Sequence, residues 1–198
     1  MTRTLLNKIT TKVSVLAATV AMAGCTAGYA TGNNSNVLLI IAGINGGDTL
    51  KSDVLTDDGV FHDTVTVAIA VRFKNPNIPT VPQIPSAVII ERYEVKYRRS
   101  DGRGVEGQDV PYTISGNMTA AFDVKTSGTD DLLLEVVRIQ AKLEPPLRNL
   151  VSITANGGGG GGLVVTMFAD ITLHGRTISG QAVQATGSLQ IDFANFGG

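Results

Sequence analysis

The strongest constraint on the fold is a regular alternation of side chains over residues 64–73, TVTVAIAVRF. Every second residue from Val65 to Phe73 is large and apolar, and the residues between them are threonine, alanine or arginine. Because successive side chains of a β-strand point to opposite faces, this period of two predicts a strand with one face in a core. The chain is therefore expected to contain a sheet that is covered on one side.

The composition extends this prediction to the rest of the chain. The sequence has 23 glycines, 5% aromatic residues with no tryptophan, and many valines, isoleucines and threonines, which favours a β domain with frequent turns. Its 198 residues are 43% apolar, so the chain is long enough for one core and too apolar to be disordered. One domain is the expectation.

Other segments carry weaker strand signals, separated by turns rich in glycine, asparagine or serine. The four prolines of 74–85 lack amide donors, so this segment is expected to cross the surface in extended form. In 87–98 the alternation places Tyr93, Val95 and Tyr97 on the same face as Ile89. Together with 64–73, strands are predicted at residues 37–44, 87–98, 110–114, 118–124, 163–174 and 182–193, the last two joined by a hairpin at 175–181.

The segment 129–143, TDDLLLEVVRIQAKL, departs from the strand pattern. Thr129 suits an N-cap and Pro145-Pro146 would end a helix. Residues 135–143 also alternate, so a strand is the alternative, but we favour an amphipathic helix. Apolar residues recur at helical spacing at Leu132, Val136, Ile139 and Leu143.

These elements predict a mainly β fold, a single antiparallel β-sandwich of immunoglobulin-like architecture with one short helix. The sandwich is expected to span 37–198, with six consecutive glycines at 157–162 forming a flexible loop. Residues 25–36 are small and polar, as expected of a flexible tether.

The first 24 residues have the composition of a secretory signal. Residues 1–12 carry three positive charges and no negative charge, and an apolar run covers 13–23. As a helix this run would span only about 17 Å, short of the roughly 30 Å hydrocarbon core of a bilayer. Removal before Cys25 would leave 13 basic and 17 acidic residues, a net charge of 13 − 17 = −4, so no binding to nucleic acid is expected.

The only cysteine of the chain stands where a lipid anchor would be attached. Met22-Ala23-Gly24-Cys25 resembles the lipobox of bacterial lipoproteins, although leucine is commoner than methionine at its first position. The resemblance covers residues 1–25 and implies that Cys25 receives a diacylglycerol on sulfur, becomes the new N-terminus and is then acylated on its amino group. Several acyl chains hold a protein firmly to a membrane, whereas one chain holds it only marginally.

This resemblance predicts a protein of the bacterial cell envelope. Thr26 follows the cysteine, where an aspartate would favour the inner membrane, so the outer membrane is favoured, with the domain facing the periplasm or the surface. The alternative is an ordinary signal peptide cut near Gly28-Tyr29-Ala30, which would release the domain.

One acidic segment, DVLTDDGVFHD, is the best candidate for a metal site. Asp57, Asp58 and Asp63, with Asp53, offer the carboxylate oxygens that calcium prefers. The spacing does not fit an EF-hand, and Asp57-Asp58-Gly59 is also an ordinary turn, so we predict no metal and no cofactor beyond the lipid on Cys25.

No catalytic set is recognised, so the chain is not expected to be an enzyme. His62 and His174 stand beside turn residues without a nucleophile motif, and Ser179 lacks the surroundings of a nucleophile elbow. A local basic group could touch lipid headgroups or an acidic polymer, but a solvated strand face explains it better. Its members are Arg92, Lys96, Arg98, Arg99 and Arg103.

The sequence thus predicts a lipid-anchored envelope protein whose non-catalytic domain binds a protein or glycan partner or has a structural role. Two alternatives are a calcium-dependent module or envelope enzyme that uses the loop from Asp53 to Asp63, and a stress-protective domain. Asn75-Pro76-Asn77, after a strand, is faintly similar to the water-stress (LEA/WHy-type) β-sandwich domains, which implies no particular activity.

Overall fold

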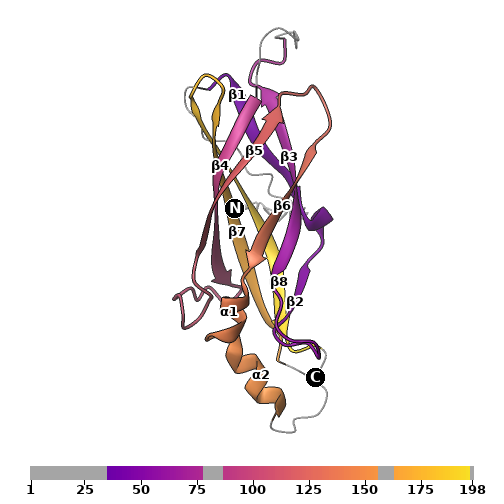
Figure 1. Ribbon diagram of the computed structural model, residues 1–198, viewed down its shortest axis with the longest axis vertical. Coiled ribbons are helices and arrows are strands. Elements are labelled where there is room, and N and C mark those ends of the chain that lie inside the picture. Colours follow the sequence, from indigo (N-terminus) through magenta and orange to yellow (C-terminus); the bar gives the residue numbers. More distant parts are fainter. Residues whose placement is uncertain (1–34, 78–86, 156–162, 197–198) are drawn as a thin grey trace, which may run out of the picture.

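The computed structural model describes residues 35–77, 87–155 and 163–196, which form a β-sandwich of two sheets (Figure 1). One sheet has the order β1-β3-β6, and the other has the order β2-β8-β7-β4-β5. All strand pairs are antiparallel except β2 with β8, which is parallel. The strands are β1 (Val37–Ile44), β2 (Leu50–Asp53), β3 (Asp63–Phe73), β4 (Ala87–Arg99), β5 (Ile114–Asp123), β6 (Asp130–Val137), β7 (Val165–Thr177) and β8 (Ala182–Ala194). The predicted mainly β sandwich is confirmed.

The core lies between the two sheets and is filled by alternate residues of nearly every strand. Val65, Val67, Ile69 and Val71 of β3 are each at most 2% exposed, which confirms the face predicted from their alternation. The second sheet contributes the inward residues of β7 and β8, from Met167 to Phe193. The strand pair predicted at the C-terminal end of the chain is confirmed, although β7 continues to Thr177 and shortens the hairpin.

The predicted faces of β4 are wrong before Arg92 because the strand contains a bulge. Its register shifts between Ile90 and Arg92 against both neighbours, and against β7 Glu91 is the extra residue. Ile90 points into the core with Tyr93, and Ile89 lies on the outer face. A regular alternation across the segment places Ile89 and Tyr93 on one face, and the structure separates them.

The predicted helix at 129–143 is also wrong over most of its length. Residues 130–137 form β6, which pairs with β3 and buries Leu132, Leu134 and Val136 while Leu133 remains 66% exposed. Only the end of the segment is helical, as α1 (Ile139–Leu143), and a second helix, α2 (Arg148–Ala155), follows. Pairing with β3 and burial against the second sheet outweigh the local helical spacing, because tertiary contacts override weak propensities.

A single strand replaces the two short strands predicted at 110–114 and 118–124. β5 runs without interruption through Ser115-Gly116-Asn117, which we expected to form a turn. Gly116 faces Tyr93 on β4, and a Cβ at Gly116 would lie only 2.3 Å from the tyrosine ring. The glycine therefore makes room for an aromatic side chain that covers the neighbouring strand.

Several predictions lie outside the described residues: the signal at 1–24, the tether up to residue 34, most of the proline-rich segment and the glycine loop at 157–162. In the described ranges 35–77, 87–155 and 163–196, no helix has the length and apolar character needed to cross a bilayer.

Candidate functional site

The acidic loop predicted as a weak metal candidate is spread along two strands and a turn. Asp53 ends β2, Asp63 begins β3, and Asp57 and Asp58 lie in a turn closed by paired hydrogen bonds between Thr56 and Gly59. The Asp53 Oδ1 atom accepts the backbone N–H groups of Leu55 and Phe196, at 3.2 and 3.3 Å. Within the part of the chain that the structure describes, no three histidine, cysteine, aspartate or glutamate residues are grouped to hold a metal.

Asp63 instead belongs to a buried ionic network at the α1 end of the sandwich. Its Oδ2 atom accepts the Ser52 hydroxyl at 2.6 Å and lies 3.0 Å from Nζ of Lys142, whose side chain is 2% exposed. The same ammonium donates to the Asp53 carbonyl at 2.7 Å. A buried charge needs such partners, so these contacts attach α1 to β2 and β3.

The candidate catalytic side chains do not form a catalytic arrangement. His62 precedes β3, whereas Ser179 lies in the β7–β8 hairpin at the other end of the sandwich (Figure 1). The Ser179 hydroxyl shares a 2.8 Å hydrogen bond with the hydroxyl of Thr177. His174 lies within β7 on the outer face of the five-stranded sheet.

Among the described residues, four members of the basic group make separate local contacts, and Arg92 makes no ion pair or hydrogen bond. Arg99 and Arg103 both bind Asp101, and hydrogen bonds from Arg103 lower the pKa of that carboxyl to about 2. Arg98 pairs with Asp170 at 3.0 Å, and its guanidinium lies 4.4 Å from the centroid of the Phe168 ring. Lys96 pairs with Glu94, 3.2 Å away.

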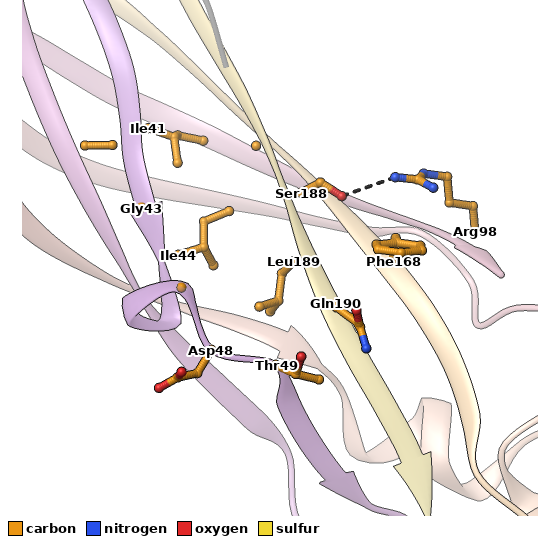
Figure 2. Close-up of a pocket in the computed structure, with 13 residues that line it drawn as sticks. Ile41, Gly43, Ile44, Asp48, Thr49, Arg98, Phe168, Ser188, Leu189 and Gln190 are labelled. Carbon is orange, nitrogen blue, oxygen red and sulfur yellow. Dashed lines mark hydrogen bonds between the residues drawn. The ribbon is translucent and has the colours of Figure 1, made fainter. Parts of the chain in front are cut away.

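Sequence reasoning missed a groove of about 420 Å³ between β1 and β8 (Figure 2). Ile41, Ile44 and Leu189 form its apolar floor. Polar side chains stand around this floor, and Ser188 accepts a 3.3 Å hydrogen bond from Arg98 beside the Phe168 ring. The polar lining residues are Asp48, Thr49, Arg98, Ser188 and Gln190.

Glycine allows β1 and β8 to approach closely beside this groove. A Cβ at Gly187 would lie 2.9 Å from Cδ1 of Ile44 and 3.0 Å from Cγ2 of Ile41. The chain then turns through Asn45, Gly46 and Gly47, which all have positive φ, before β2 pairs with β8. The Asn-Gly-Gly turn was readable in the sequence, but the groove was not, because its two walls come from opposite ends of the chain.

Strand edges border the groove on both sides. β2 pairs with β8 only over residues 191–194, and β1 pairs only with β3, so within the described ranges neither sheet extends across the gap. Unpaired edge groups offer N–H donors and C=O acceptors to an extended ligand. The groove thus combines an apolar floor with directional polar groups, as ligand sites commonly do.

Comparison with known proteins gave no significant match to a family model, a curated protein or a solved structure.

Proposed function

We propose that this chain is a lipid-anchored protein of the bacterial cell envelope whose β-sandwich binds an envelope partner without catalysing a reaction. The groove between β1 and β8 is the observation that carries the binding role. Its partner is an extended segment of a protein or a glycan, since both present alternating apolar surface and hydrogen-bonding groups.

The anchor is supported by the sequence around Cys25 and by the place where the chain enters the domain. β1 begins at the end of the sandwich opposite to α1, α2 and the C-terminal residues (Figure 1). The ten residue steps from Cys25 to Ser35 reach at most about 35 Å when extended. A lipid on Cys25 would therefore keep the end where β1 starts close to the membrane.

The anchor is tested by intact mass and detergent partitioning of the protein made in a bacterial host, beside the Cys25→Ser variant. We expect the wild type to lose residues 1–24, gain acyl mass and enter the detergent phase, and the variant to do none of the three. A soluble wild-type product cut near Ala30 would contradict the anchor.

The binding role is tested with two matched substitutions of exposed threonines on the same sandwich. Thr49→Trp places a bulky ring at the groove, and Thr119→Trp places it on β5, away from the groove. With both substitutions made in the non-acylated Cys25→Ser background, we expect only Thr49→Trp to abolish co-sedimentation with cell-envelope fractions stripped of native protein. Equal retention of both variants would contradict a role for the groove.

A further inference from the structure

A second hollow, of about 330 Å³, lies on the outer face of the five-stranded sheet. Arg92 of β4, His174 of β7 and Gln184 of β8 line it from three adjacent strands, and they occupy one row because Arg92 is opposite His174 and His174 is opposite Gln184. Residues on neighbouring strands in register have their Cβ atoms about 5 Å apart, so their polar ends can reach one ligand.

The β4 bulge creates this arrangement. Glu91 is the extra residue, so Glu91 and Arg92 both belong to the outer face while Ile90 and Tyr93 are buried. Gly175 stands opposite the bulge, where a Cβ would lie 2.5 Å from the carbonyl oxygen of Ile89. Bulges often redirect side chains in this way beside binding sites.

Among the described residues around the hollow, one cation has no counter-charge. Glu91 pairs with Arg176 at 3.1 Å, and Glu94 pairs with Lys96 at 3.2 Å. Across the described ranges, the half-buried guanidinium of Arg92 has neither an ion pair nor a hydrogen bond, and the Gln184 amide has no side-chain partner. Unsatisfied, partly desolvated donors are costly, and an oxyanion accepts from several of them at once.

The ring of His174 lies in the hollow and should respond to a bound anion. Its Nε2 atom is sealed from solvent with no hydrogen-bond partner among the described residues. Burial lowers the pKa of His174, and the positive charges of Arg92 and Lys96 lower it further, while Glu94 acts in the opposite direction. A bound anion would offset the effect of Arg92, so the ring of His174 should sense occupancy.

We propose that this hollow binds a single phosphate or carboxylate group, held by the guanidinium of Arg92 and the amide of Gln184. The inference rests on the proposed role of the sandwich as a binding domain. The hollow would give that domain a second contact, with an anionic group of the ligand, on the outer face of the five-stranded sheet. A solvent-open hollow in which the described residues leave the Arg92 guanidinium unpaired suits a group at the end or side of a larger ligand.

The test is an NMR titration of the protein purified in mild detergent, at constant ionic strength, with sodium phosphate in one arm and sodium acetate in the other, against sodium chloride. The chain has two histidines, so exposed His62 serves as the internal control. We expect a saturable shift of the His174 ring signals in at least one arm and no saturable shift of His62.

Two variants and a matched control complete the test. Arg92→Gln should weaken binding by at least about tenfold, the equivalent of losing a charge-assisted hydrogen bond. Gln184→Ala, which leaves the charge unchanged, should weaken it a few-fold. Lys51→Gln removes the same charge from exposed β2 and should leave binding unchanged.

Absence of saturation at His174 in both arms would overturn the inference, and so would an equal loss in Arg92→Gln and Lys51→Gln. Neither outcome affects detergent partitioning through Cys25 or the comparison of Thr49→Trp with Thr119→Trp. Failure of the anionic site is therefore distinguishable from failure of the proposed function.

Discussion

At the scale of single residues, Tyr97 connects the two sheets of the sandwich. Its hydroxyl on β4 donates a 2.6 Å hydrogen bond to the carbonyl of Val136 on β6, and the residue is only 7% exposed. Burial raises the pKa of this phenol, so the folded protein holds it in the protonated, donating form.

Replacing this residue should therefore change both stability and its pH dependence. Tyr97→Phe removes the hydroxyl that donates to the Val136 carbonyl and should lower the free energy of unfolding by about 1–2 kcal/mol. Because the folded pKa is raised, the tyrosine contributes stability below its unfolded pKa of about 10 that is lost as the pH rises above that value. Urea unfolding at neutral pH and above pH 10 should show a smaller alkaline loss for the variant than for the wild type.

Some alkaline loss should persist in that variant, because burial also raises the pKa of Tyr93. Tyr112 is 59% exposed, so Tyr112→Phe is the control and should match the wild type. An alkaline loss unchanged by Tyr97→Phe would contradict the role of the buried phenol.

At the scale of elements, the β4 bulge depends on the glycine that faces it. Gly175→Ala would force its new Cβ to within 2.5 Å of the Ile89 carbonyl oxygen, which is backbone and cannot rotate away. The expected cost is about 1–3 kcal/mol, as for other overpacked sites. Thermal melting should show this loss, whereas Gly104→Ala, with no atom within 4 Å of its Cβ, should melt like the wild type. Equal melting temperatures would mean that the bulge relaxes without cost.

The elements also show what the sequence could and could not reveal. β3, β7 and β8 were predictable because their alternation is uninterrupted and local. β6 was missed because Leu132 and Val136 fit a helix as well as a strand, and only pairing with β3 decides between them. Three features depend on how strands distant in sequence pair with one another, and no local pattern encodes that pairing. They are the bulge at Glu91, the groove, and the row from Arg92 to Gln184.

At the scale of the whole molecule, the proposed anchor on Cys25 and the shape of the sandwich together predict an orientation at the membrane. The β7–β8 hairpin lies at the end where β1 begins, and α1 lies at the opposite end (Figure 1). β7 has 13 residues, and a strand of that length spans about 43 Å at about 3.3 Å per residue. This span exceeds the reach of about 35 Å between Cys25 and Ser35. A tether of that length therefore does not bring the α1 end as close to an anchor on Cys25 as the end where β1 starts.

Membrane proximity should therefore differ between two equally exposed positions at opposite ends. Ile178 in the hairpin and Leu143 in α1 are 53% and 52% exposed, and acylation of Cys25 would leave an introduced cysteine as the only free thiol. With a fluorophore on Ile178→Cys or Leu143→Cys in lipid vesicles, spin-labelled lipids should quench the first more strongly, because the chain enters the domain at that end. Addition of Cys25→Ser should remove quenching at both positions. Stronger quenching at Leu143→Cys would instead place the α1 end on the bilayer and contradict the proposed orientation.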